Sequence, residues 1–195
     1  IIDEAWYGHA YFHPEFRPTA LEAGADYSTQ STHKVMSAFS QASMIHVNDV
    51  DFNEHIFREN YNMHTSTSPQ YAMIASLDVA RRQMSMEGYK LLSRTLELAA
   101  ELRTQINSTK VFRVLELDDM LPDELKQDGI RLDPTKITLD VSKSGYTVEE
   151  LQRELFEHYN IQVEKTTFNT LTLLLTIGTT RSKCSRLYDA LMRIA

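Results

Sequence analysis

The chain has 195 residues, of which 42% are hydrophobic, and its formal net charge is −7 at pH 7. This length and composition can build an ordinary buried core, in one domain or two small ones. An acidic chain without a dense Lys/Arg cluster does not suit nucleic acid or an anionic membrane surface, so small molecules or proteins are the expected partners. Cys184 is the only cysteine, which excludes an intrachain disulfide and favours a reducing, cytoplasmic setting.

No segment of the sequence has the pattern of a membrane span or an export signal. The longest apolar stretch, residues 170–177, is far shorter than the roughly 20 residues that a spanning helix needs. Residues 1–6 lack the basic and apolar regions of a signal peptide and have the composition of a buried strand. We therefore expect the chain to begin inside a larger enzyme.

The first half of the chain is expected to be the end of a larger α/β domain. Residues 26–31 and 41–47 have strand-like composition and are bounded by polar or turn-prone residues, so Lys34 falls on the connection between two strands. From Pro69 onward the apolar residues recur at helical spacing and continue past Gly88, where we expect a bend between two helices.

The second half alternates strands and helices, which predicts a small α/β domain. Strands are expected at residues 110–116, 136–141, 161–166 and 171–177, and helices at residues 148–159 and at the C-terminus. Thr147 and Glu150 have the spacing of a capping box at the start of the first of these helices. Cys184 falls on the apolar face of the last helix, so it is expected in the core. The expected domains are residues 1–87 and 88–195.

The segment around Lys34 combines groups that suit a phosphorylated aldehyde cofactor. A lysine can form a Schiff base with pyridoxal 5′-phosphate (PLP), and Ser31 and His33 can contact a phosphate. Asp3 ends the opening strand, and its carboxylate could pair with a protonated pyridine nitrogen, at ~4 kcal/mol before desolvation. Taken one at a time, however, Lys34 has the ordinary interpretation of a surface charge and Asp3 that of a strand cap.

In combination, the motifs of this chain resemble the bacterial ornithine/lysine/arginine decarboxylases, which are PLP-dependent enzymes of the type I, aspartate-aminotransferase fold. The similar segments extend over nearly the whole chain and are residues 3–6, 12–14, 29–34, 38–46, 64–69, 133–136 and 163–166. The resemblance implies an α/β fold in which the end of the PLP-binding large domain, with a mixed sheet, is followed by a small α/β C-terminal domain.

The resemblance also implies a role for each matching residue near the start of the chain. Lys34 would bond PLP covalently, and Asp3 would pair with the pyridine nitrogen. Ala5 would pack against one face of the ring, where a small side chain leaves room for the flat cofactor. Ser31 and His33 would contact the phosphate.

Other matching residues are implied to complete the site. In this family the site lies at the interface of a homodimer, and a hydroxyl of the partner subunit reaches the phosphate; Ser66 is the best match and Thr65 the second. Trp6 would line the site entrance, although a lone Trp is often a packing anchor. Glu164 would share a strand face with Gln162 and Thr166 and hold the distal cation of a basic substrate, or remain a solvated strand residue.

The expected function is PLP-dependent decarboxylation of lysine, arginine or ornithine to the corresponding amine, with Lys34 or His33 as the acid that protonates the α-carbon. We expect the chain alone to bind PLP poorly and to be inactive. No metal is expected: His9 and His13 are four apart, but Pro14 follows them and no acidic third ligand is nearby. Two alternatives stay open: another type I activity, such as an aminotransferase or carbon–carbon lyase, and a non-catalytic regulatory relative.

Overall fold

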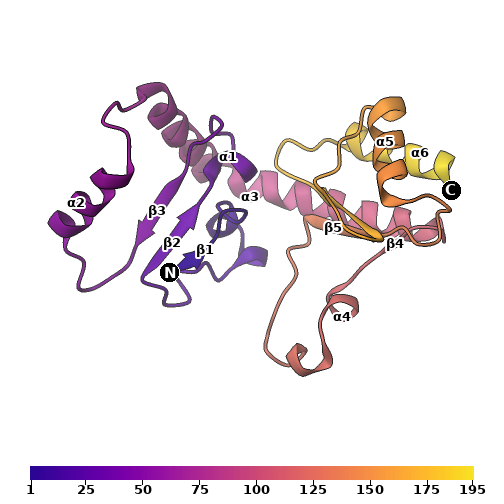
Figure 1. Cartoon of the computed structure of the whole chain (residues 1–195), viewed down its shortest axis with the longest axis horizontal. Coiled ribbons are helices and arrows are strands. Elements are labelled where there is room, and N and C mark those ends of the chain that lie inside the picture. Colours follow the sequence, from indigo (N-terminus) through magenta and orange to yellow (C-terminus); the bar gives the residue numbers. More distant parts are fainter. The chain divides into compact units, whose positions relative to one another are not determined.

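The computed structural model covers all residues from Ile1 to Ala195, and the chain divides into two units (Figure 1). The first unit comprises Ile1–Leu92 and the second Ser93–Ala195. The division falls inside the long helix α3 (Tyr71–Ser108), and so does the expected boundary between residues 87 and 88. None of the helices combines the length and the apolar composition that a membrane crossing requires.

The first unit contains a three-stranded mixed sheet in the order β1-β2-β3. Strand β1 (Ile2–Asp3) runs parallel to β2 (Tyr27–Gln30), which runs antiparallel to β3 (Met44–Val47). Strands β2 and β3 lie inside the two ranges that the sequence predicts, and the mixed pairing is as expected. Two short 3₁₀ helices, Ala10–Phe12 and Pro14–Phe16, follow β1, and the one-turn helix α1 (Thr32–Val35) connects β2 to β3.

Helix α2 (Glu54–His64) was not expected from the sequence. Asn53 caps its start by accepting a hydrogen bond from the Ile56 N–H at 3.0 Å, but the helix buries no residue. Its apolar residues Ile56, Tyr61 and Met63 are exposed, so this helix has no buried face within one chain.

Helix α3 runs without interruption through Gly88, so the expected bend between two helices is wrong. Gly88 is buried, and a Cβ atom placed on it would lie 3.1 Å from the Cβ atom of Phe12 and 3.1 Å from Cε of Met84. The glycine therefore allows the helix to pack closely against the segment after β1, and it does not end the helix.

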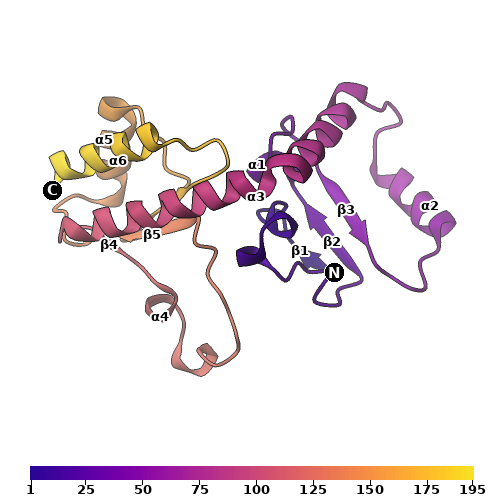
Figure 2. The same ribbon diagram turned by 180° about the vertical axis from the view of Figure 1, so that it is seen from behind.

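The second unit contains a four-stranded antiparallel sheet in the order β4-β5-β7-β6. Its strands are β4 (Arg113–Val114), β5 (Lys136–Asp140), β6 (Lys165–Thr166) and β7 (Thr170–Leu174), and its helices are α4 (Leu117–Met120), the 3₁₀ helix Asp123–Leu125, α5 (Val148–Tyr159) and α6 (Arg181–Ile194). The C-terminal half of α3 lies alongside this sheet, with α5 and α6 near it (Figure 2). Alternate residues of β5 and β7 are buried together with apolar residues of α3, α5 and α6 in one hydrophobic cluster.

The start of helix α5 is as predicted. The Thr147 N–H donates to Glu150 Oε2 at 2.9 Å, and the Glu150 N–H donates to Thr147 Oγ1 at 3.2 Å, which confirms the capping box. Cys184 is buried on α6, as expected.

The expected strand 161–166 is reduced to Lys165–Thr166, so Glu164 precedes the strand. The reason is the end of α5: Asn160 adopts a left-handed conformation, and the Ile161 N–H donates to the Leu155 carbonyl at 2.8 Å. The first residue of the expected strand, Ile161, thus satisfies one of the last carbonyls of the helix. The expected strand 110–116 is likewise shortened, to Arg113–Val114.

Candidate active site

Two of the predicted site segments meet at one edge of the first sheet, which we call the cofactor edge: the end of β1 at Asp3 and the end of β2 at Gln30. Because β1 and β2 are parallel, with Asp3 opposite Thr29, their carboxyl ends lie at the same edge, where α/β sheets bind ligands. Asp3 is exposed, and its Oδ1 accepts a hydrogen bond from the Ala5 N–H at 2.8 Å. This bond shapes the turn that carries Ala5 past the strand end.

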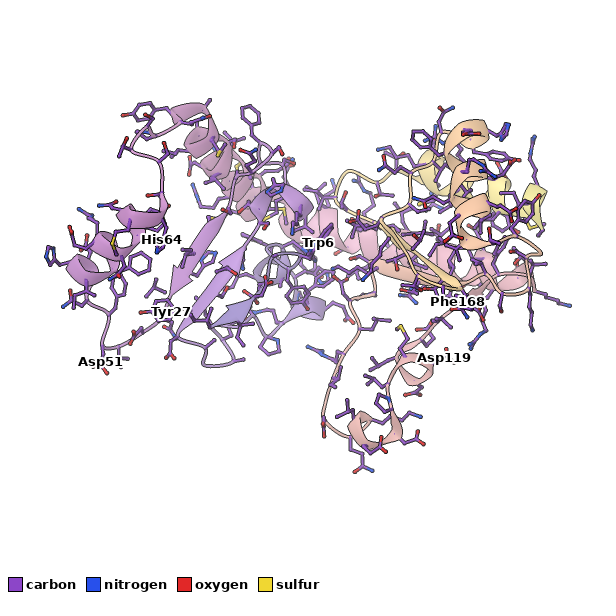
Figure 3. All side chains as sticks on the ribbon, viewed as in Figure 1. Trp6, Tyr27, Asp51, His64, Asp119 and Phe168 are labelled. Carbon is purple, nitrogen blue, oxygen red and sulfur yellow. The ribbon has the colours of Figure 1, made fainter.

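Lys34 lies on helix α1, directly after the cofactor edge. Its Nζ atom is 4.8 Å from the centroid of the Trp6 ring, and both side chains are half-buried. Figure 3 labels Trp6 in the first unit, on the turn that follows β1. The structure therefore brings Lys34 and Trp6 together, a contact that no pattern in the sequence indicates.

The residues before Lys34 present a hydroxyl and an imidazole beside it. Ser31 is the N-cap residue of α1, but its side chain makes no capping hydrogen bond. The Ala42 carbonyl accepts from the His33 N–H at 3.2 Å and contacts His33 Nδ1 at 3.0 Å. A carbonyl only accepts, so Nδ1 carries the hydrogen and Nε2 is the ring nitrogen that can contact a ligand.

Sequence reasoning missed a buried carboxylate between Asp3 and Ala5. Glu4 is only 6% exposed, and its oxygens accept hydrogen bonds from the Ala20 N–H at 2.8 Å, Ser28 Oγ at 2.7 Å and Gln30 Nε2 at 3.0 Å. Gln30 Oε1 in turn contacts His46 Nε2 at 2.9 Å. We call these residues the Glu4 network. The sequence feature that could have indicated it is the polar pair Ser28 and Gln30, which lie two apart on β2 and so share one face.

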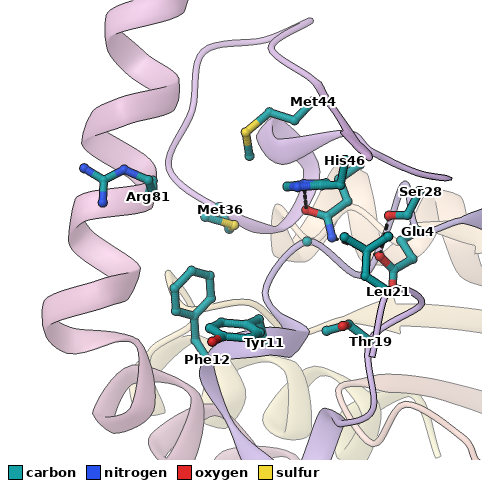
Figure 4. Close-up of a pocket in the computed structure, with 12 residues that line it drawn as sticks. Glu4, Tyr11, Phe12, Thr19, Leu21, Ser28, Met36, Met44, His46 and Arg81 are labelled. Atoms are coloured by element: carbon teal, nitrogen blue, oxygen red, sulfur yellow. Dashed lines mark hydrogen bonds between the residues drawn. The ribbon is translucent and has the colours of Figure 1, made fainter. Parts of the chain in front are cut away.

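The Glu4 network borders a cavity of about 290 Å³, which we call the rear cavity (Figure 4). Its apolar wall includes Tyr11, Phe12, Met36 and Met44. Successive residues of a strand face opposite sides of the sheet, so Asp3 and its neighbour Thr29 face away from the side that holds Glu4 and Ser28. The rear cavity is therefore on the other side of the sheet from Asp3, and none of the predicted site residues lines it.

The remaining predicted site residues lie on other segments of the chain. Thr65 is the C-cap residue of α2, and Ser66 follows it as an exposed residue whose Oγ accepts from the Ser68 N–H at 3.2 Å. Glu164 is exposed in the second unit, where its N–H donates to the Thr172 carbonyl at 2.9 Å. Within one chain, no contact joins Thr65 or Ser66 to the cofactor edge.

His9 and His13 both have structural surroundings. His9 is buried and packs edge-on against the Phe16 ring, with centroids 4.6 Å apart. His13 Nδ1 accepts from the Glu15 N–H at 3.2 Å, and its ring stacks on Tyr89 at 4.9 Å. No group of three or more His, Cys, Asp or Glu side chains gathers in the chain in a way that could hold a metal ion.

In the second unit, the similar segment 133–136 forms a compact polar turn before β5. Asp133 pairs with the Lys136 ammonium and accepts from Thr135 Oγ1 at 2.6 Å. Burial alone would raise the pKa of Asp133, but the Lys136 charge and the Thr135 hydrogen bonds outweigh it and lower the pKa below its ordinary value. Arg103 on α3 donates to the Lys136 carbonyl at 3.1 Å and so ties the turn to the helix.

The fold is that of the type I PLP-dependent enzymes. The structure of the Francisella novicida lysine decarboxylase is similar over 98% of this chain and 31% of that chain, with a TM-score of 0.83 and 31% identity. The structure of Oryza sativa TDC with PLP matches with a TM-score of 0.68 over 98% of this chain and 40% of that chain; at 16% identity, this likeness shows the fold alone.

The family is defined by sequence. The model of the Orn/Lys/Arg decarboxylase major domain matches residues 1–183, and the chain therefore belongs to the Orn/Lys/Arg decarboxylase family. The arginine decarboxylase of Bacillus cereus is 34% identical over 195 residues, which are 100% of this chain and 42% of that protein. The chain thus spans about two fifths of this relative's length. These findings confirm the family and the fold class expected from the sequence.

Proposed function

We propose that this chain carries the cofactor-bonding residues of a PLP-dependent decarboxylase that converts lysine, arginine or ornithine to the corresponding di- or polyamine. The proposal depends most on one observation: Asp3 ends β1 and Lys34 follows the adjacent parallel strand β2 at the same sheet edge, in a chain of the Orn/Lys/Arg decarboxylase family. An amine and a carboxylate so placed match the two ends of the pyridine ring that a protein must bind.

The residues at the cofactor edge fit PLP chemically. Lys34 supplies the amine, and the exposed Asp3 carboxylate supplies a partner for the pyridine nitrogen. Ala5 has a side chain small enough to lie against a flat ring. Ser31, whose hydroxyl makes no capping bond, and His33, which presents Nε2, supply donors for the phosphate. When bound, PLP would take up the electrons of the bond that breaks at the substrate α-carbon.

The chain's own residues would then hold and move charge. Asp3 would keep the ring nitrogen protonated by pairing with it. Lys34 would give up its place to the substrate amine, and Lys34 or His33 would deliver a proton to the α-carbon after carbon dioxide leaves. Trp6 would line the entrance, and Glu164 would bind the distal cation of the basic substrate as a charge-assisted pair.

We further propose a homodimer in which Ser66, with Thr65 as the second choice, reaches the phosphate of the partner subunit's site. In support, both hydroxyls lie on the segment after α2, a helix that buries none of its residues within one chain. We also place the protein in the cytoplasm, since its one cysteine is a free thiol.

Reductive trapping tests the proposal. The chain is incubated with excess PLP, because even a weakly held adduct accumulates when borohydride makes the bond to the amine permanent. Peptide mapping is expected to find a much larger labelled fraction for Lys34 than for the exposed Lys143, which serves as the internal reference. Lys34→Ala should abolish this excess and Lys143→Ala should not. Labelling of Lys34 at only the level of Lys143 would contradict the proposal and favour a non-catalytic relative.

Product analysis then identifies the reaction. Because the chain spans about two fifths of its relative's length and is expected to be inactive alone, the assay uses an enzyme of the relative's length that contains this chain. Each of the three basic amino acids is supplied to it with PLP, and amines, carbon dioxide and keto acids are measured. An amine with an equal amount of carbon dioxide is expected for a decarboxylase. A keto acid would assign the protein instead to the aminotransferases of the same fold.

A further inference from the structure

The Lys34 ammonium has an aromatic partner before any cofactor is considered. Its Nζ is 4.8 Å from the centroid of the Trp6 ring, inside the distance of about 6 Å at which a cation is attracted to a ring face, and Trp is the most effective ring. The first unit's ion pairs join Arg17 to Glu22, Arg58 to Glu54 and Arg81 to Asp78, and none includes Lys34. The indole face is thus the group positioned to hold this cation.

We propose that Trp6 is a positioning residue whose indole face holds the Lys34 ammonium whenever the amine is not bonded to the cofactor. This inference rests on the proposed function, in which Lys34 must leave its place to the substrate amine and later return. A released lysine side chain is long and flexible, and it would otherwise sample many rotamers in solvent. The ring confines it beside the cofactor edge.

The chemistry of the indole suits a reversible hold. Its ring nitrogen is a hydrogen-bond donor only, so Trp6 attracts the cation through its ring face and offers no atom that accepts the ammonium proton. A carboxylate at the same position would form a direct ion pair with the ammonium and compete with the return of Lys34. Both Trp6 and Lys34 are half-buried, which keeps the pair partly shielded from water.

Competitive acetylation of the whole chain tests this role without cofactor. At about pH 8, the uncharged lysine nitrogen attacks a carbonyl carbon of acetic anhydride, acetate leaves, and the amine proton passes to the buffer. A cation held by the ring is withdrawn from this reaction. Trp6→Leu is therefore expected to raise the acetylation of Lys34, relative to the exposed Lys143, by about twofold to fivefold. Trp6→Phe retains a weaker ring and should raise it less.

The chain contains a matched control. The Arg17 guanidinium carbon lies over the Tyr11 ring, also at 4.8 Å, and Tyr11→Leu should leave the Lys34-to-Lys143 ratio unchanged. Repeating the assay at about pH 11, where an ordinary lysine is mostly uncharged, should remove most of the Trp6→Leu effect.

Two outcomes would overturn the proposal: no increase at about pH 8, or an increase of equal size at about pH 11, which would mean that the indole only shields the amine. Because the assay contains no PLP, its result is independent of whether reductive trapping labels Lys34.

Discussion

Replacing Glu4 with alanine tests whether the carboxylate behind the sheet stabilises the first unit. The change removes the acceptor of three hydrogen bonds, from the Ala20 N–H, Ser28 Oγ and Gln30 Nε2. Ala20 and Ser28 are buried, Ser28 completely, so water cannot easily replace the lost acceptor. Each buried donor left without a partner costs about 1–3 kcal/mol, while the desolvation cost of the carboxylate is recovered in part. We expect Glu4→Ala to reduce the free energy of unfolding by about 3–5 kcal/mol.

The Glu4→Gln variant separates shape from charge. A glutamine retains one acceptor oxygen for the Ala20 N–H, but its amide nitrogen would face the Gln30 amide nitrogen. The Gln30 amide can rotate by half a turn, so that its oxygen accepts from the new amide nitrogen. Gln30 Nε2 then faces His46 Nε2, which must accept a hydrogen bond in place of its present contact with Gln30 Oε1. We therefore expect a smaller loss, about 1–2 kcal/mol, from the weaker neutral hydrogen bonds and the adjustment at His46.

The assay is urea unfolding followed by the fluorescence of Trp6, which is the only tryptophan and lies in the first unit. Glu87→Ala removes an exposed carboxylate from the same unit and should change stability by no more than about 0.5 kcal/mol. If Glu4→Ala unfolded at the same urea concentration as Glu87→Ala, the Glu4 network would contribute nothing, and the reasoning would be refuted.

Three further predictions concern the second unit. The pKa of Asp133 is lower in the folded chain than its ordinary value of 3.8, so the ionised carboxylate stabilises the fold above pH 3.8. This stability is lost as the pH falls from 3.8 through the lowered pKa. The urea concentration at the midpoint of unfolding should therefore depend less on pH in Asp133→Asn, between about pH 5 and pH 2, than in the unchanged chain. Burial raises the pKa of the Cys184 thiol, so iodoacetamide should alkylate the folded chain at least about tenfold more slowly than the unfolded chain, as mass spectrometry can measure. Thr147→Ala should cost about 1 kcal/mol by removing the cap of α5, and Thr147→Ser should restore most of it; equal urea midpoints for the two variants would count against the cap.

The elements that the sequence predicts well are those whose signals are local. Helix α5 begins and ends at the expected residues, because its capping box and its buried stripe both lie within the segment itself. The length of a strand instead depends on how far its neighbour pairs with it. Strand β6 is shorter than expected, and the first residue of the expected strand, Ile161, donates instead to the end of α5. The sequence pattern at Gly88 predicts a bend, but the glycine leaves room for Phe12, which is distant in the sequence.

The candidate site divides in the same way. The positions of Asp3 at the end of one strand and of Lys34 after the next follow from patterns of a few residues. In the structure these two parallel strands end at the same sheet edge. The Trp6–Lys34 contact and the Glu4 network depend on tertiary packing, which local patterns do not record. A search for residues that face a ligand also passes over Glu4, because its carboxylate is directed behind the sheet.

The alternation of Asp3, Glu4 and Ala5 links the stability of the sheet to the geometry of the site. Asp3 and Glu4 face opposite sides, and the hydrogen bonds that fix Glu4 to Ser28 and Gln30 hold the end of β1 against β2. A shift of the Glu4 backbone is readily passed on to Asp3, since a single rigid peptide unit joins their Cα atoms. A substitution in the Glu4 network should therefore reduce the trapping of PLP at Lys34 even where the fold survives, although no atom of the network lies on the side of the sheet that Asp3 faces.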